Sequence, residues 1–430
     1  MKVIIVGAGI GGLTTALSLE AAGITDVTLY EAVSELRPLG VGINLLPHAV
    51  RELTELGLGE QLKGFGVATS TLSYTNRLGQ TIWSEPRGLS AGYQWPQYSV
   101  HRGQLQMLLR DTVLERLGAD SIHLGASGDD VQQHGAREDG GCSSLRITVA
   151  DGSSYRVSAD VIIAADGIHS AVRRQRYPDE GAPVWNGLIL WRGTARVAPF
   201  LDGRTMIMAG DAFQKFVAYP LSLPGDDGLA TINFIAEYRS DDADPGVSSW
   251  NRSADPATVL DRFADWDFDW LDVRSIIGAA EEILEYPMVD RDPIPRWTFG
   301  AQTLLGDSAH AMYPIGSNGA SQAIIDARTL ANALATAGSI SEALQRYEDA
   351  RRPRTTAITL SNRSMGPEQV MQLAYERAPQ GFDDIDTVIP YAERAEIAER
   401  YKKAAGFIPD ELNARPSLSV ERAVTSEVSR

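Results

Sequence analysis

The chain has 430 residues, of which 43% are hydrophobic and 22% are charged, and its formal net charge is −17. This composition is typical of a globular protein and excludes a fully disordered or fibrous chain. The acidic balance opposes binding to nucleic acid and to anionic membranes, so we expect neither as a partner.

A single cysteine, Cys142, excludes an internal disulfide and a cysteine-based metal site, and we expect no metal. A chain that needs no oxidising compartment is typical of the cytoplasm. The apolar start of the chain is broken by glycines, and no later apolar stretch reaches the ~18 residues of a membrane span. We therefore expect a soluble cytoplasmic protein.

The first residues have the pattern of a nucleotide-binding unit. Residues 2–6 (KVIIV) predict a strand that is buried on both faces of a parallel sheet. A glycine loop (GAGIGG) follows at residues 7–12, and helical apolar spacing follows the loop. Residues 26–30 (DVTLY) predict a second strand. A bare GxGxxG is a weak signal, but the order strand, glycine loop, helix, strand makes it specific.

The glycines and the acid of this unit each have a physical task. Gly7 permits a tight turn, and Gly9 lets a pyrophosphate approach the backbone. Gly12 lets the helix and the strand pack closely. Glu31 ends the second strand, where a carboxylate binds the hydroxyl pair of an unphosphorylated ribose, as in FAD or NAD.

Two later segments also combine a strand, a polar loop and a helix. Residues 161–164 (VIIA) lead to the pair Asp166-Gly167, and residues 303–305 lead to Gly306-Asp307. Asp307 is placed to bind a ribityl hydroxyl. A helix that begins near Gly319 is placed to stabilise negative charge on a reduced flavin. Taken singly, either segment also fits an ordinary connection between a strand and a helix.

Together, the three loops resemble the single-component FAD-dependent aromatic hydroxylases, the p-hydroxybenzoate and salicylate hydroxylase family, in order and spacing. Further stretches resemble the phenazine-carboxylate monooxygenases of that family: residues 37–44, 84–88, 98–103, 286–293 and 304–323. The resemblance covers roughly residues 1–360 and fades after Arg363.

The resemblance implies an α/β fold with a Rossmann-like FAD-binding domain, a discontinuous β-sheet substrate domain and C-terminal helices. The implied FAD-binding domain comprises residues 1–70, 98–182 and 286–345. The implied substrate domain comprises residues 71–97 and 183–285, and alternating apolar patterns between residues 188 and 238 agree with a largely antiparallel sheet. We expect a helical region at residues 346–408 and a mobile tail at 409–430, where no core pattern is visible.

The resemblance also implies which residues bind the cofactor. In chain order they are Gly7, Gly9, Gly11, Gly12, Glu31, Gly42, Arg102, Asp166, Gly167, Asp307 and Gly319. Arg102 would meet the pyrophosphate, which suits a planar cation. Pro314 and Gly316 would border the isoalloxazine ring together with Gly42 and Gly319, and their loop would adapt as the ring moves. The resemblance also implies that Asp166 and Gly167 contact both FAD and NAD(P)H. The family has no second Rossmann domain for the nicotinamide cofactor, and no second GxGxxG after a strand is visible here.

The implied chemistry belongs mainly to the flavin. NADH or NADPH reduces the flavin, O₂ adds at C4a, and the hydroperoxide transfers one oxygen to a small aromatic or heteroaromatic molecule of the phenazine or salicylate type. If the attacked carbon carries a carboxylate, hydroxylation with loss of CO₂ becomes possible. Two other classes stay open: a flavin oxidase or dehydrogenase of a small molecule, and a non-catalytic FAD-binding protein. The oligomeric state is not predicted.

Pro314 and Gly316 are also candidates for the substrate pocket. Three further residues are candidates as well, each with a structural alternative. Arg192 follows the apolar residues 188–190 and needs a partner, either a substrate carboxylate or, slightly favoured, an acidic neighbour. Tyr219 presents a phenol to the substrate or packs in the core. His48 accepts a proton in the pocket or, more in keeping with its position, lies on the surface at a helix start.

Overall fold

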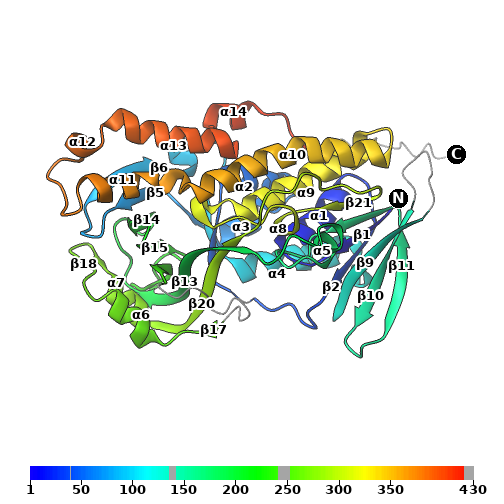
Figure 1. Cartoon of the computed structure of the whole chain (residues 1–430), viewed down its shortest axis with the longest axis horizontal. Helices are drawn as coiled ribbons and strands as arrows, with labels where there is room; N and C mark the ends of the chain where they lie inside the picture. The colour runs from blue at the N-terminus through cyan, green and yellow to red at the C-terminus, as the bar shows by residue number, and fades with distance from the viewer. Residues whose placement is uncertain (39, 135–141, 241–251, 421–430) are drawn as a thin grey trace.

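The computed structural model describes residues 1–38, 40–134, 142–240 and 252–420 (Figure 1). Two large β-sheets lie toward opposite ends of the molecule, and the C-terminal helices run along one side (Figure 1). Within these residues, no helix is both long enough and apolar enough to cross a membrane.

A five-stranded parallel sheet has the strand order β21-β12-β1-β2-β8. Its strands are β1 (Lys2–Val6), β2 (Asp26–Glu31), β8 (Ile122–Leu124), β12 (Val161–Ala164) and β21 (Gln302–Leu304). β1 pairs with β2 and β12, and every residue of β1 after Lys2 is buried. The carboxyl ends of β1, β12 and β21 therefore lie at one edge, and each strand runs into one of the predicted loops.

Helices cover this sheet and share its core. They are α1 (Ile10–Ala21), α2 (Pro47–Glu55), α3 (Gly59–Phe65), α4 (Arg102–Leu117), α5 (Ala171–Arg176), α8 (Asp307–His310) and α9 (Gly319–Thr336). α1 begins directly after the glycine loop and packs against both α4 and α9. Leu13 and Leu17 of α1 are fully buried with Ile5 of β1.

The second large sheet has eight strands in the order β17-β20-β13-β16-β15-β14-β5-β6. Its strands are β5 (Thr71–Thr75), β6 (Thr81–Pro86), β13 (Val184–Val197), β14 (Thr205–Gly210), β15 (Gln214–Pro220), β16 (Ala230–Arg239), β17 (Arg252–Ser253) and β20 (Ala280–Asp290). All pairs are antiparallel except β5 with β14.

Both faces of this sheet are covered, so its strands alternate between two cores. Met206 and Met208 of β14 pack with α11 (Gln369–Arg377) and α13 (Tyr391–Ala405). Ile207 and Ala209 pack instead with α6 (Pro256–Arg262) and α7 (Val273–Gly278).

Smaller elements complete the fold. They are the sheets β9 (Ala126–His134) with β10 (Cys142–Val149) and β11 (Ser154–Ala159), β3 (Gly42–Leu45) with β7 (Tyr98–His101) and β4 (Val67–Ala68), and β18 (Asp267–Phe268) with β19 (Leu271–Asp272). The remaining helices are α10 (Ile340–Arg363), α12 (Ile385–Val388), α14 (Pro409–Ala414) and the 3-10 turns η1 (Gly88–Ala91), η2 (Ala119–Ser121), η3 (Ile315–Ser317) and η4 (Gly366–Glu368).

The predicted fold class is confirmed: a Rossmann-like parallel unit, a separate β-sheet and C-terminal helices are all present. The division of the chain into domains stays a prediction. The two large sheets support it in outline, although β20 runs across the predicted boundary at residue 286.

The expected mobile tail is wrong for residues 409–420. Leu412 of α14 is buried beside Phe407. Arg51 of α2 donates hydrogen bonds to the carbonyls of Leu412 (3.0 Å) and Arg415 (2.8 Å), and Arg415 pairs with Glu52. These partners come from a helix more than 350 residues earlier, so no local pattern in the tail indicates them. Residues 421–430 lie outside the described residues.

Candidate active site

A cavity of about 360 Å³ lies between the parallel sheet and the eight-stranded sheet. The structure brings many of the predicted site residues to its wall: Gly9, Gly11, Gly42, Arg102, Gly167, Arg192, Tyr219, Asp307, Pro314 and Gly319. Loops that are far apart in the sequence therefore converge on one space, as the strand pattern predicts.

Three of the four glycines in the glycine loop differ in the space that surrounds them. Gly7 has a φ of +101°, and a Cβ there would lie 2.4 Å from the carbonyl oxygen of Ala165. A Cβ on Gly12 would lie 2.0 Å from the carbonyl oxygen of Gly7. A Cβ on Gly9, in contrast, would meet nothing within 4 Å, although Gly9 lines the cavity. Gly7 and Gly12 thus serve the packing of the chain, and the space beside Gly9 is free for a ligand.

Glu31 lies behind this loop and not on the cavity wall. Its carboxylate accepts hydrogen bonds from the backbone N–H groups of Ala8 (2.7 Å) and Val33 (3.0 Å). Gln106 of α4 donates to the carbonyl of Ala8 at 2.9 Å, so the loop is held from two sides. The role of Glu31 toward a ribose stays a prediction.

In the loop after β12, Asp166 and Gly167 have different surroundings. Gly167 lines the cavity, whereas Asp166 turns its carboxylate to the start of α5. One oxygen of Asp166 accepts a hydrogen bond from the N–H of Ala171 at 2.8 Å, and its other oxygen is buried without a partner. Burial raises the pKa of Asp166. Contact of Asp166 with a cofactor stays a prediction.

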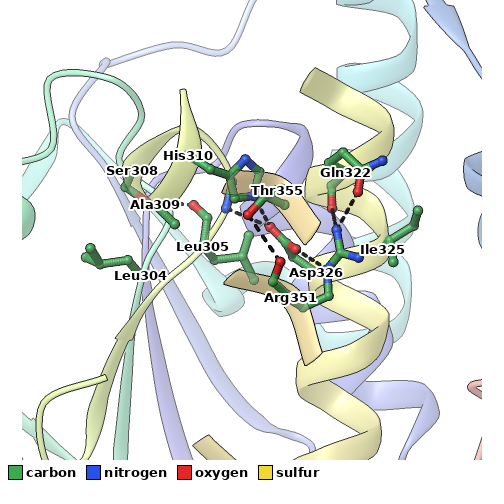
Figure 2. A network of polar contacts seen from close by, with 12 residues as sticks. Leu304, Leu305, Ser308, Ala309, His310, Gln322, Ile325, Asp326, Arg351 and Thr355 are labelled. Carbon is green, nitrogen blue, oxygen red and sulfur yellow. Dashed lines mark hydrogen bonds and ion pairs between the residues drawn. The ribbon is translucent and has the colours of Figure 1, made fainter. Parts of the chain in front are cut away.

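A buried polar network supports the Gly306-Asp307 loop (Figure 2). Asp326 of α9 accepts hydrogen bonds from the N–H of Gly306 (3.2 Å), Nε2 of His310 (2.5 Å) and Nε of Arg351 (2.6 Å). Burial alone would raise the pKa of Asp326, but His310 and Arg351 outweigh it and lower that pKa to about 2. The network ties the loop to α9 and α10 through a carboxylate that is ionised at neutral pH.

Arg192 projects from β13 into the cavity wall. Its guanidinium donates to the carbonyl of Gly42 at 3.0 Å, and its Nε is buried without a partner. In the described part of the chain no carboxylate forms an ion pair with Arg192, so the acidic neighbour that the sequence slightly favoured is not found. Tyr219 lies beside it on β15, and burial raises the pKa of Tyr219 to about 12 against the opposing effect of Arg192. Tyr219 is therefore a neutral hydrogen-bond donor at neutral pH.

Two predicted pocket residues lie elsewhere. His48 is fully buried between Gln322, at 3.2 Å, and the ring of Phe407, so neither the pocket role nor the surface position is found. Burial, reinforced by nearby arginines, lowers the pKa of His48 well below its ordinary value. Gly316 has a φ of +67° and packs against Tyr401, where a Cβ would lie 2.0 Å from the hydroxyl. Both corrections have one cause, which is packing by C-terminal residues distant in sequence.

The site also contains residues that the sequence analysis missed. Asp326 lies in a run of apolar residues with helical spacing. A single acid in such a run was the sequence signal that could have indicated a buried, paired carboxylate. The wall opposite the glycine loop is formed by Met206, Met208, Val217 and Ile235. These residues alternate along three strands, but the sequence alone does not tell which face of the sheet meets the cavity.

The comparisons with known proteins agree with this architecture. A model of the FAD-binding domain family matches residues 1–181 and 285–361, and the chain belongs to this family. It is 48% identical over 368 residues to the phenazine 1,6-dicarboxylic acid hydroxylase of Lysobacter antibioticus, with 84% of this chain and 89% of that protein covered. It is 31% identical over 426 residues to the 3-amino-4-hydroxybenzoate 2-monooxygenase of Streptomyces cremeus, with 97% and 98% covered.

A solved structure of HpxO from Klebsiella pneumoniae, complexed with FAD and uric acid, has a TM-score of 0.71 to this chain at 23% identity. It covers 95% of this chain and 96% of HpxO, which confirms the fold. The chain is therefore an FAD-dependent aromatic monooxygenase, with NADH or NADPH as the reductant.

The residues present fit a bound FAD. The free space beside Gly9, the start of α9 at Gly319 and the guanidinium of Arg102 all face the same cavity. Backbone N–H groups at a helix start and a planar cation are the groups that bind a pyrophosphate and an anionic ring edge.

Proposed function

We propose that this enzyme hydroxylates a planar heteroaromatic carboxylic acid of the phenazine or salicylate type, and that Arg192 binds the carboxylate. The observation that supports this is an unpaired guanidinium at one end of an apolar slot. Met206, Met208 and Ile235 form an apolar wall, and the half-buried guanidinium of Arg192, which forms no ion pair within the described residues, favours an anion beside it. The hydroxylases named above act on aromatic acids, which agrees with such a slot.

When bound, the flavin supplies the reduction by NAD(P)H and the activation of O₂. The chain's own residues orient the ring and exclude water. Arg192 fixes the carboxylate, and the neutral phenol of Tyr219 donates a hydrogen bond beside it. If Arg192 holds the carboxylate on the attacked carbon, hydroxylation releases CO₂, and the mass of the product decides this point.

We expect the substitution Arg192→Leu to raise the KM for the aromatic acid ten- to a hundredfold. A hydrogen bond to a charged group contributes about 1.5–3 kcal/mol, and Leu removes both the charge and the donor. Steady-state NAD(P)H oxidation with phenazine, quinoline and phenolic acids measures the effect, with hydrogen peroxide assayed alongside to detect uncoupled turnover.

The matched control is Arg196→Leu, four residues along the same strand, where an exposed arginine pairs with Asp227. It should leave KM within about twofold of the unaltered enzyme. An Arg192→Leu enzyme with an unchanged KM for every stimulating acid would contradict the assignment. If no aromatic acid stimulates NAD(P)H oxidation at all, the proposed substrate class is wrong.

We further propose that the enzyme works in the cytoplasm and without nucleic acid or membrane partners. Two features support this: the net charge of −17 repels polyanions, and the single cysteine needs no oxidising compartment.

A further inference from the structure

The slot has polar groups at both ends and apolar groups between them. Across β15 and β16, Tyr219 lies opposite Asn233, Val217 opposite Ile235, and Lys215 opposite Glu237. Four residues of a strand span about 13 Å. Arg192 lies opposite Ile235, and its guanidinium reaches Gly42 at the end that Tyr219 marks. Lys215 and Glu237 mark the far end.

The far end contains an ionic cluster that the mechanism above does not use. Nζ of Lys215 lies 2.9 Å from Oε2 of Glu237 and also contacts Glu368 of η4. The side chains of Lys215, Glu237 and Glu368 are 6%, 5% and 3% exposed. One ammonium therefore balances two buried carboxylates, which leaves the cluster one negative charge in excess, and such an excess is costly in a buried site.

Glu237 and Glu368 each border cavities as well as packed protein. Glu237 and Glu368 line the substrate cavity, and both also line a second cavity of about 350 Å³ on their other side. Glu237 thus presents a carboxyl group to the slot while Lys215 fixes it from the neighbouring strand.

The surroundings of Glu237 favour the uptake of one proton by the cluster of Glu237, Glu368 and Lys215. Burial raises the pKa of Glu237 to about 7, and Glu368 reinforces this effect against the opposing charges of Lys215 and Arg192. Asp211, Arg239 and Arg363 line the adjoining cavity, and Arg102 and Asp307 line the substrate cavity together with Glu237. At neutral pH the cluster is therefore close to taking up one proton, which would cancel its excess charge.

Building on the proposed function, we propose that Glu237 is a specificity-determining residue that donates a hydrogen bond to a second carboxylate at the far end of the substrate. The preferred substrate is then a planar polycyclic acid with a carboxylate toward each end. Arg192 binds one carboxylate, and the protonated carboxyl of Glu237, positioned by Lys215 and Glu368, binds the other. A carboxylate cannot approach the ionised cluster favourably, so binding of the dicarboxylate takes one proton from solution onto Glu237.

Calorimetric titration of the oxidised, FAD-loaded enzyme, without NAD(P)H, tests this. The ligands are phenazine-1,6-dicarboxylate and, with a single acidic end, phenazine-1-carboxylate. Titrations at pH 8 in buffers of different ionisation enthalpy count the protons bound. We expect binding of the dicarboxylate to be accompanied by uptake of close to one proton from solution. Binding of the monocarboxylate should be accompanied by uptake of close to none. Between pH 8 and 9 the affinity for the dicarboxylate should fall about tenfold.

Two substitutions separate recognition from mere structural support. Glu237→Gln keeps a donor and an acceptor, so it should bind the dicarboxylate with an affinity independent of pH and without proton uptake. Glu237→Met should lose at least tenfold in affinity for the dicarboxylate and less than about threefold for the monocarboxylate. Glu281→Gln, an exposed position on β20 of the same sheet, is the matched control and should behave as the unaltered enzyme.

The proton count of the unaltered enzyme decides the question even if a variant fails to fold. Binding of the dicarboxylate with no proton uptake overturns the role of Glu237 and leaves the proposed function standing. If neither acid binds, this inference falls, whereas the proposed function falls only if no phenazine, quinoline or phenolic acid stimulates NAD(P)H oxidation.

Discussion

The substitution Gly9→Ala is expected to weaken FAD binding by roughly ten- to a hundredfold while the protein without FAD stays folded. The added Cβ would meet no protein atom within 4 Å, so the fold has room for it. The same Cβ would enter the cavity where the dinucleotide approaches the backbone, and overpacking costs about 1–3 kcal/mol. Equilibrium dialysis with FAD measures the affinity, and urea unfolding of the FAD-free protein measures the stability.

Gly12→Ala is the matched comparison, three residues further along. Its Cβ would lie 2.0 Å from the carbonyl oxygen of Gly7, which is backbone and cannot move aside cheaply. We expect this variant to lose about 3 kcal/mol or more of unfolding free energy before any cofactor is added. Equal FAD affinity for Gly9→Ala and the unaltered protein would show that the cofactor does not pass this loop.

The substitution Asp326→Asn is expected to remove about 3–5 kcal/mol of unfolding free energy at pH 7. It leaves Arg351, whose side chain is 5% exposed, without its buried carboxylate. The Gly306-Asp307 loop depends on the same carboxylate, so FAD should also dissociate at a lower urea concentration. Far-ultraviolet circular dichroism and flavin fluorescence, followed in parallel through a urea titration, measure both effects.

The same residue predicts a dependence on acid. The pKa of Asp326 is lowered from 3.8 to about 2 in the folded protein, where His310 and Arg351 outweigh the effect of burial. Its ionisation therefore stabilises the fold fully above about pH 4 and ceases to do so as the pH falls through about 2. A shift of this size is equivalent to roughly 2–3 kcal/mol. The Asp326→Asn protein lacks this contribution.

Asp349→Asn is the control for this experiment. Asp349 is exposed on α10, the helix that carries Arg351, and accepts a hydrogen bond from Gln345 at 2.9 Å. We expect its unfolding free energy to change by less than about 0.5 kcal/mol. If Asp326→Asn unfolds at the same urea concentration as this control, the network in Figure 2 does not support the loop as described.

Local patterns were sufficient to predict the parallel unit and the convergence of its loops. The strand before Gly7, the strand before Asp166 and the strand before Asp307 are each visible as short apolar runs. Parallel strands bring their carboxyl ends to one edge, so the loops had to meet once the strands were recognised. Arg192 and Tyr219 also reach the cavity; the sequence marked Arg192 as a charge beside an apolar run and Tyr219 as a phenol, but did not tell which face of the sheet they share.

The residues that the sequence did not reveal depend on contacts between distant segments. Lys215 meets Glu237 because of the register between β15 and β16, and a shift by one residue would separate them. His48 was assigned to the surface or the pocket, but α9 and Phe407 enclose it. Arg415 is held against α2 because it forms an ion pair with Glu52 of that helix. Spacing along the chain contains no information on such pairings.

The central claim is that this chain binds FAD where the three loops converge and holds an aromatic acid in the adjoining slot, so that one atom of O₂ would be added to the acid. The most direct measurement is the mass of the product after turnover of the FAD-loaded enzyme with NAD(P)H, ¹⁸O₂ and the aromatic acid that best stimulates NAD(P)H oxidation. We predict a hydroxylated product that carries one ¹⁸O atom from O₂. A product whose new oxygen comes from water, or NAD(P)H oxidation that yields only hydrogen peroxide with every acid tested, would contradict the claim.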